Sequence, residues 1–269
     1  MAIESIDDLA AFAARLAEAA RGETLPRFRA QTEIRNKAGA LFDPVTDADR
    51  EAERAIRRLI GAAHPEHGII GEEFGAENTG AEWRWVLDPV DGTRAFICGV
   101  ASWTTLIALE RGGVPVLGII DQPFTDERWL GVPGVGTVYA RAGARRVCGA
   151  SGLEALPEAR IATTDPRKEG YFTPEEADAF AALAAKARVA RFSLDAYAYG
   201  LLALGEIDLV VEAGLNHHDY AALVPVVEGA GGVITGWKGE PVQESERGRI
   251  LAAAPALHAA ALAALNGRA

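Results

Sequence analysis

A short apolar run that ends in two carboxylates, Trp-Val-Leu-Asp-Pro-Val-Asp at residues 85–91, constrains this chain more than any other stretch. The apolar residues at its start predict a buried strand. Pro89 fixes its own φ and favours an extended conformation for the residue before it, so the chain should turn sharply where it leaves the sheet. Asp88 and Asp91 can then converge on one point, and the carbonyl of Val90 can face the same point.

The two residues behind this run favour a ligand site at the turn. Gly92 lets the backbone come close to a ligand, and Thr93 can cap a helix that starts there. A cluster of oxygen ligands beside a helix N-terminus suits a hard cation and a phosphate together. An Asp-rich turn followed by a capped helix would explain the bare Asp-Pro-x-Asp pattern equally well.

Two earlier segments also place acids at the end of a predicted element. In the first, Pro-Val-Thr-Asp-Ala-Asp at residues 44–49, Thr46 or Asp47 can cap a helix that runs to about Ala63. Acidic residues in the first turn suit the helix dipole, so capping alone would explain Asp47 and Asp49.

The second of these segments is Gly-Ile-Ile-Gly at residues 68–71, which predicts a short strand that runs into Glu72 and Glu73. A solvated loop would explain two glutamates on their own. Three segments in the first half of the chain place acidic residues at the end of a predicted element, which favours a shared site instead.

The last acidic candidate is Glu-Ala-Gly-Leu-Asn-His-His-Asp at residues 212–219. Glu212 ends a predicted strand, and Asp219 opens a predicted helix. The adjacent His217 and His218 beside an acid could indicate a zinc site, but neighbouring side chains on a helix diverge and no cysteine is near. We expect the other histidines on the surface: His64, His67 and His258.

Charge and composition narrow the class of protein. The 269-residue chain has a formal net charge of −11 with scattered basic residues, so nucleic acid is not an expected partner. An acidic protein that binds a phosphate substrate needs cations to mediate the contact, and divalent metal would supply them. No apolar run approaches the roughly 18 residues of a membrane span, and no signal peptide is visible. We therefore expect a cytoplasmic protein without a membrane partner. Cys98 and Cys148 show no metal-type spacing and no disulfide framework.

The order of predicted elements indicates two halves with different patterns of secondary structure. Residues 1–148 predict two helices, one at 5–30 that is disturbed around Pro26 and one at about 46–63. A largely antiparallel sheet follows, in which the Gly112-Gly113 turn joins two strands. Residues 149–269 predict strands that alternate with helices, which implies a sheet connected by crossovers and covered by helices. In this second half we expect helices at 174–187, 195–204, 220–229 and 256–266.

Asp-Pro-Val-Asp-Gly-Thr preceded by Trp-Val-Leu closely resembles the signature of the inositol monophosphatase family of metal-dependent phosphatases. Pro-Val-Thr-x-x-Asp ending at Asp49, Gly-Glu-Glu at residues 71–73 and the late Asp219 match further family segments in the same order, so the resemblance covers essentially the full chain. The family usually has an aromatic residue where this chain has His218. The resemblance implies the layered αβαβα sandwich of the inositol monophosphatase and fructose-1,6-bisphosphatase type, with an N-terminal α+β half and a C-terminal α/β half. It also implies a homodimer.

By the same resemblance, the reaction is hydrolysis of a phosphate monoester with two or three Mg²⁺ ions. The implied metal ligands are Glu72, Asp88, the carbonyl of Val90, Asp91 and Asp219. The residues implied to orient a water or take its proton are Thr93, Asp49 and Glu73. Asp47 lies so close to the motif position of Asp49 that the choice between the two stays open. The implied substrate contacts are Gly92, Thr93, Asp195, Glu212 and Asp219. A regulatory module that binds metal or phosphate without catalysis is the alternative from another class.

Within the family, the runs at 99–109, 195–203 and 207–212 look most like the histidinol-phosphatases of histidine biosynthesis. Histidinol phosphate carries an ammonium group and an imidazole, whereas inositol phosphate carries only hydroxyls. A pocket for the former should offer carboxylates away from the metals, and Asp195 and Glu212 are the candidates. Inositol 1-phosphate is the alternative, since Glu212 alone could bind a hydroxyl, and a broad range of sugar and nucleotide phosphates is another.

Overall fold

The computed structural model describes residues 5–30, 34–36, 44–168 and 170–267. The first helix, α1 (Ile6–Thr24), begins at Ser5, whose side chain accepts a hydrogen bond from the backbone N–H of Asp8 at 3.1 Å. It ends before Pro26, which lies in a 3-10 turn (Leu25–Arg27) and lacks the N–H that a continuing α-helix needs. The helix expected over residues 5–30 therefore ends where the sequence predicts that Pro26 disturbs it.

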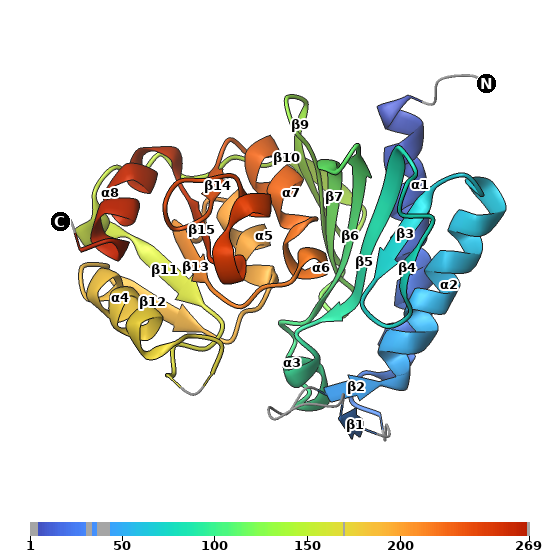
Figure 1. Cartoon of the computed structure of the whole chain (residues 1–269), viewed down its shortest axis with the longest axis horizontal. Coiled ribbons are helices and arrows are strands. Elements are labelled where there is room, and N and C mark those ends of the chain that lie inside the picture. The colour runs from blue at the N-terminus through green and yellow to red at the C-terminus, as the bar shows by residue number, and fades with distance from the viewer. Residues whose placement is uncertain (1–4, 31–33, 37–43, 169, 268–269) are drawn as a thin grey trace.

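A small two-stranded sheet, β1 (Ile34–Asn36) and β2 (Pro44–Thr46), leads into the second helix, α2 (Asp47–Ala63). Helices α1 and α2 pack on each other and together cover one face of the large sheet (Figure 1). Their buried apolar residues, such as Leu16 and Ile56, meet Leu87 and Ile107 of that sheet.

The large sheet has eight strands in the order β10-β9-β8-β7-β6-β5-β3-β4. Only the β3–β5 pair is parallel among these neighbours. The strands are β3 (Gly68–Gly71), β4 (Gly75–Glu77), β5 (Trp83–Asp91), β6 (Thr104–Arg111), β7 (Val114–Gln122), β8 (Glu127–Val132), β9 (Gly136–Arg141) and β10 (Ala144–Val147). After β5 comes a one-turn helix, α3 (Thr93–Ile97).

The smaller sheet has five strands in the order β12-β11-β13-β15-β14. Its strands are β11 (Arg160–Thr163), β12 (Val189–Phe192), β13 (Leu209–Glu212), β14 (Val233–Thr235) and β15 (Ile250–Ala253). The helices of this part are α4 (Pro174–Ala184), α5 (Tyr197–Ala203), α6 (His217–Tyr220), α7 (Leu223–Gly229) and α8 (Pro255–Leu265). The helix expected at 220–229 is two helices, because the chain ends α6 at Tyr220 and begins again at Leu223.

The two sheets enclose a shared layer of helices, which confirms the expected αβαβα order. Helices α4 and α8 pack on the outer face of the small sheet, and α5 and α7 lie between the two sheets (Figure 1). The central core joins Leu106 of the large sheet, Leu202 and Val227 of the middle helices, and Val210 of the small sheet. This packing brings the end of β5 against segments more than a hundred residues later in the chain.

Two of the histidines expected on the surface, His64 and His67, are buried at the end of α2. Their rings stack with centroids 4.6 Å apart, and Trp85 donates its indole N–H to Nδ1 of His67 at 3.1 Å. The prediction of surface positions was wrong because two polar rings next to each other can be satisfied by stacking and by one buried tryptophan.

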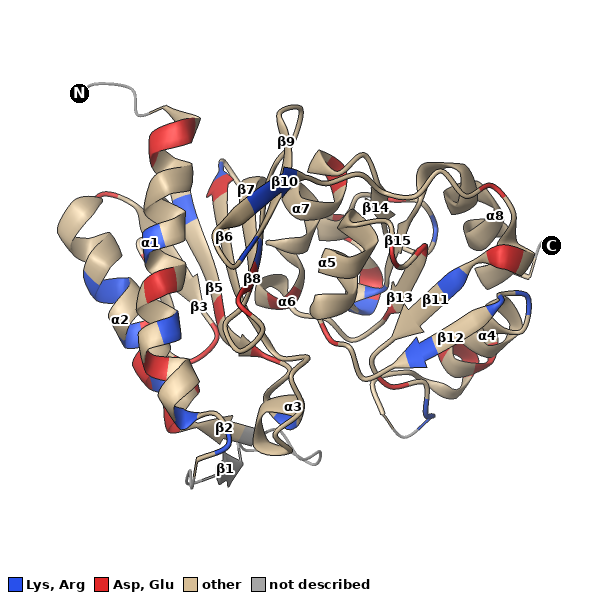
Figure 2. Ribbon diagram, turned by 180° about the vertical axis from the view of Figure 1, so that it is seen from behind, with Lys and Arg blue, Asp and Glu red and all other residues tan. Residues whose placement is uncertain are grey.

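No helix among the described residues is long and apolar enough to cross a membrane. Charged residues of both signs occur along α1 and α2, and basic residues occur on β10, at the edge of the large sheet (Figure 2).

Candidate active site

The two aspartates at the end of β5 face the same side because the strand is irregular there. Asp88 lies opposite Leu106 of β6 and Asp91 lies opposite Thr104, so three steps along β5 match two steps along β6. In a regular strand, residues three apart point to opposite faces. The extra residue corrects this, and Asp88 and Asp91 converge as the sequence predicts.

Gly92 allows the chain to turn from this strand into α3. Its φ of 77° and ψ of 42° are left-handed, a region that favours glycine. A Cβ built at Gly92 would lie 2.9 Å from Cγ of Asp195, so there is also no room for a side chain at this position. Two independent constraints therefore require glycine at this position.

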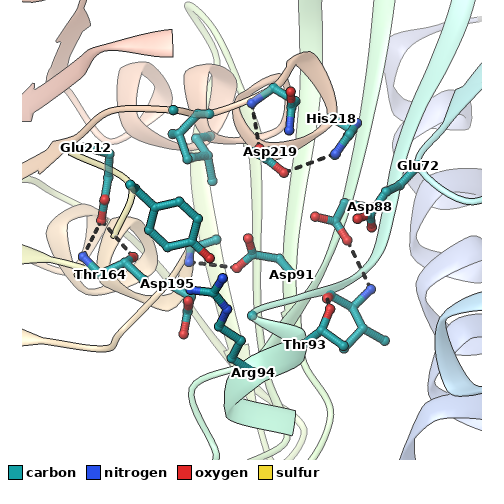
Figure 3. A pocket seen from close by; sticks show the side chains of 18 of the residues that line it. Glu72, Asp88, Asp91, Thr93, Arg94, Thr164, Asp195, Glu212, His218 and Asp219 are labelled. Atoms are coloured by element: carbon teal, nitrogen blue, oxygen red, sulfur yellow. Dashed lines mark hydrogen bonds and ion pairs between the residues drawn. The ribbon is translucent and has the colours of Figure 1, made fainter. Parts of the chain in front are cut away.

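Five side chains form two groups of three that could each hold a cation, and the two groups share one residue (Figure 3). The first is Glu72, Asp88 and His218, and the second is Asp88, Asp91 and Asp219. Within each group the candidate ligand atoms all lie within 4.8 Å of one another. Asp88 belongs to both groups, which is the arrangement of a carboxylate that bridges two cations.

The electrostatics of these acids fit divalent cations. Burial raises the pKa of Asp88 well above its usual range, and the nearby Glu72 and Asp91 raise it further. Burial, followed by Asp195, does the same to the pKa of Asp91. Carboxylates gathered in this way repel one another unless positive charge enters, and carboxylate and carbonyl oxygens are the ligands that Mg²⁺ prefers. The residues present therefore fit Mg²⁺.

Asp49, rather than Asp47, lies beside this cluster. Asp49 is buried at the start of α2, where Oδ2 accepts hydrogen bonds from the backbone N–H of Thr46 at 2.9 Å and from its hydroxyl at 2.5 Å. Oδ1 lies 3.3 Å from the hydroxyl of Thr93, which is also 3.0 Å from the carbonyl of Val90. Asp47 is exposed. Burial raises the pKa of Asp49 to about 7, against the hydrogen bonds from Thr46 and with smaller contributions from Glu72 and Glu73.

Glu72 lines the pocket, whereas Glu73 is not among its lining residues. The backbone N–H of Glu73 donates to Oε2 of Glu53 at 2.8 Å, and the N–H of Phe74 donates to Oε1 at 3.2 Å. Glu53 is fully buried on α2 and also accepts a hydrogen bond from Arg57 at 2.8 Å. It holds the loop that carries Glu72. Sequence reasoning missed it, although its place on the apolar face of α2, four residues before an arginine, was a usable signal.

Asp195 and Glu212 also line the pocket and belong to neither cation group. Asp195 lies near Asp91, and Glu212 lies farther from the cation groups, beside Thr164 (Figure 3). Asp195 has a φ of 49° and accepts a hydrogen bond from the Ser102 hydroxyl at 3.3 Å. Burial raises its pKa to about 6, against the effects of Ser102 and Arg94. Arg94 lines the same part of the pocket.

Glu212 is buried at the end of β13. Its Oε1 accepts hydrogen bonds from the backbone N–H and the hydroxyl of Thr164 at 2.7 and 2.8 Å, and its Oε2 accepts from Thr163 at 3.3 Å. Burial raises its pKa to about 8 in spite of these bonds. Sequence reasoning missed two further lining residues: Tyr171 and Arg94, whose guanidinium lies 5.0 Å above the Tyr171 ring.

The adjacent histidines diverge, as their spacing predicts. His217 turns to the large sheet, where its Nε2 lies 2.6 Å from Oε1 of the buried Glu110. His218 turns into the pocket, and its Nε2 lies 3.3 Å from Oδ1 of Asp219. The divergence argues against a zinc site made from both rings.

Comparison with known proteins gives consistent matches over nearly the whole chain. A family model described as "Inositol monophosphatase family" matches residues 5–268. The histidinol-phosphatase of Streptomyces coelicolor is 35% identical over 98% of both chains. The bifunctional phosphatase IMPL2, chloroplastic, of Arabidopsis thaliana is 42% identical over 87% of this chain and 66% of its own length. The solved structure of an inositol monophosphatase from Zymomonas mobilis is 43% identical, with a TM-score of 0.86 over 98% of this chain and 100% of that one.

Proposed function

The chain belongs to the inositol monophosphatase family, a family of phosphatases, and we propose that it is a Mg²⁺-dependent phosphate monoester hydrolase that acts on L-histidinol phosphate. The observation that carries the substrate assignment is the pair of pocket acids Asp195, which is half-buried, and Glu212, which is buried. Neither belongs to the two cation groups. An inositol phosphate has no positive charge for such a pair to bind.

The proposed metal ligands are Glu72, Asp88, the carbonyl of Val90, Asp91 and Asp219. Bound Mg²⁺ would supply positive charge that stabilises the transferring phosphoryl group and the leaving oxygen, and would lower the pKa of a water. Asp88 would serve both positions because it belongs to both groups of candidate ligands.

The chain itself would position the attacking water and receive its proton. The Thr93 hydroxyl can donate to Asp49 Oδ1 while it accepts a hydrogen bond from a water in the pocket. Asp49 is the proposed proton acceptor, because a carboxyl with a pKa near 7 is suited to general base catalysis at neutral pH. Glu73 would act through Asp49, whose pKa it helps to raise, since its own side chain does not line the pocket. The backbone N–H groups of Gly92 and Thr93 would bind the phosphate.

The remaining groups would recognise the rest of the substrate. The ammonium of histidinol phosphate would bind Asp195 or Glu212, and a charged hydrogen bond of this kind contributes about 1.5–3 kcal/mol. Relatives named histidinol-phosphatase in Streptomyces coelicolor and Mycobacterium tuberculosis are each 35% identical to this chain and support the assignment. That the enzyme is a cytoplasmic homodimer in histidine biosynthesis is part of the same proposal.

Inositol 1-phosphate is the second candidate substrate. The 43% identity to the Zymomonas mobilis inositol monophosphatase supports this candidate. Glu212 also supports it, because its carboxylate could bind a hydroxyl instead of an ammonium. Arg94 in the pocket also lowers the net negative charge that a cationic substrate would meet. A broad specificity for sugar or nucleotide phosphates would follow if neither acid contributes to recognition.

A substrate panel tests the proposal. Release of phosphate should be measured with Mg²⁺ on histidinol phosphate, inositol 1-phosphate, glucose 6-phosphate, AMP and ethanolamine phosphate. We expect the highest kcat/KM for histidinol phosphate. A higher value for inositol 1-phosphate would overturn the substrate assignment but not the proposal that the protein is a Mg²⁺-dependent phosphate monoester hydrolase. No turnover of any of them would favour a module that binds metal or phosphate without catalysis.

A further inference from the structure

His218 is the one nitrogen donor in the two groups of candidate cation ligands. One of its ring nitrogens lies within 4.8 Å of carboxylate oxygens of both Glu72 and Asp88. Its side chain is 20% exposed, and Figure 3 shows it on the same side of the pocket as Glu72 and Asp88, with its drawn contact to Asp219. The aromatic residue that the family usually has at this position would offer no lone pair.

The local structure fixes this orientation. Asn216 is the N-cap of helix α6, and its backbone N–H donates to Oδ2 of Asp219 at 2.6 Å. On the first turn, His217 is anchored to the buried Glu110, which also pairs with Arg84 at 2.9 Å. Successive residues on a helix point about 100° apart, so anchoring His217 on the large sheet directs His218 toward the acids.

We propose that the imidazole of His218 is a ligand to the cation held by Glu72 and Asp88, and that this position therefore prefers a divalent transition metal such as Mn²⁺ to Mg²⁺. The inference rests on the metal site of the proposed function and adds a ligand to it. Imidazole suits Fe, Ni, Cu and Zn best and is also a ligand that Mn²⁺ accepts, whereas Mg²⁺ keeps to oxygen ligands. Two carboxylates and one imidazole therefore make a different donor set from the all-oxygen group of Asp88, Asp91 and Asp219.

The competing role for His218 is a contact with Asp219 alone. The 3.3 Å distance from its Nε2 to Asp219 Oδ1 would then be a hydrogen bond or an ion pair that orients this acid. A ring nitrogen that carries a proton cannot bind a metal, since coordination needs its lone pair. A spectroscopic measurement on the metal can therefore distinguish the two roles without reference to turnover.

The direct test is pulsed electron paramagnetic resonance of Mn²⁺ added at less than one equivalent to the chelator-treated full-length protein. Nitrogen coupled to the bound ion should appear in the wild type and disappear in His218→Phe. The matched control is His217→Gln, which removes the neighbouring imidazole but keeps an N–H donor for Glu110, and it should retain the nitrogen signal. Calorimetric titration should show that His218→Phe weakens Mn²⁺ binding roughly tenfold or more and weakens Mg²⁺ binding much less.

Each other outcome has a distinct meaning. Bound Mn²⁺ without nitrogen coupling in the wild type would overturn the inference and leave the proposed phosphatase intact. Loss of the nitrogen signal in His217→Gln with its retention in His218→Phe would overturn it as well. Failure of the wild type to bind either Mn²⁺ or Mg²⁺ would remove the metal site on which both the inference and the proposed function depend.

Discussion

Asp91 accepts a hydrogen bond of 2.8 Å from the backbone N–H of Ala196, so the end of β5 is joined directly to the residue that follows Asp195. The bond spans 105 positions in the sequence and connects the proposed metal side of the pocket to the proposed substrate side. Asp195 in turn raises the pKa of Asp91. The geometry of one side therefore depends on the other, and substitutions must be tested for effects on both metal binding and substrate selectivity.

Removal of metal should abolish activity. A chelator should stop phosphate release, and excess Mg²⁺ should restore it. Asp88→Asn should lower kcat by several orders of magnitude, because the loss of a carboxylate shared by two cations removes several kcal/mol of transition-state stabilisation. The variant should fold, and in chelator at pH 8 it should melt at or above the wild-type temperature, because a buried and repelled charge is gone. Full activity in chelator after dialysis would refute the role of metal.

The hydroxyl of Thr93 should matter to the chemical step. Thr93→Val keeps the shape of the side chain but removes the contacts to Asp49 and Val90, and we expect kcat to fall roughly 10²- to 10⁴-fold. Thr93→Ser restores the hydroxyl and should recover most of the loss. Mg²⁺ titration of both variants separates a catalytic effect from a metal-binding effect. Equal activity of the Val and Ser variants would remove Thr93 from the mechanism.

Glu53 should support both the fold and the metal site. Glu53→Ala leaves Arg57 and the backbone N–H groups of Glu73 and Phe74 without their buried acceptor, so we expect a loss of about 3 kcal/mol in the free energy of unfolding. Mg²⁺ affinity should fall too, because Glu53 holds the loop of Glu72. The matched control is Glu51→Ala on the same helix, where an exposed pair with Arg54 is lost at a cost below about 1 kcal/mol. Similar denaturation midpoints for the two variants would contradict the assignment.

In chelator, the stability of the protein should fall as pH rises from about 5 to about 8. The folded state raises the pKa of Asp195 to about 6, of Asp49 to about 7 and of Glu212 to about 8, from ordinary values of 3.8, 3.8 and 4.5. Between these two sets of values the folded chain holds more protons than the unfolded chain, so each rise in pH favours unfolding. Added Mg²⁺ should reduce the fall, because cations replace protons among the acids. Melting temperatures at four pH values, with and without Mg²⁺, check this, and a rise in chelator from pH 5 to 8 would refute it.

The sequence predicted the parts of the site that depend on local pattern. Pro89 lies between Asp88 and Asp91 and Gly92 follows them, so the turn and the convergence of the two acids could be predicted from the sequence. The layered fold followed from the order of the elements and from the family resemblance. The same reasoning could not choose between Asp47 and Asp49, because the choice depends on which one faces Thr93 across the fold.

The groups that sequence reasoning missed owe their roles to contacts between distant segments. Glu53 acts on a loop twenty residues later, and Tyr171 reaches the pocket from the segment before α4. His218 was read as a departure in the pocket wall, and only its proximity to Glu72 and Asp88 indicates a ligand. Helical or strand periodicity carries no information about such pairs.

Asp195→Asn is the sharpest test of the substrate. Asparagine tolerates the φ of 49° at this position and can still accept the hydrogen bond from Ser102, so the change removes charge with little effect on structure. The ratio of kcat/KM for histidinol phosphate to that for a neutral sugar phosphate should fall about tenfold to a hundredfold, as expected for one lost charged hydrogen bond. The matched control is Asp165→Asn, which removes an acid that is paired with Arg167 and does not line the pocket, and it should leave the ratio unchanged.

Because Ala196 joins the segment of Asp195 to Asp91, Mg²⁺ affinity must be measured for both variants. If Asp195→Asn lowers kcat/KM equally for both substrates at saturating Mg²⁺, Asp195 supports the metal site rather than substrate recognition. The assignment to histidinol phosphate is then wrong.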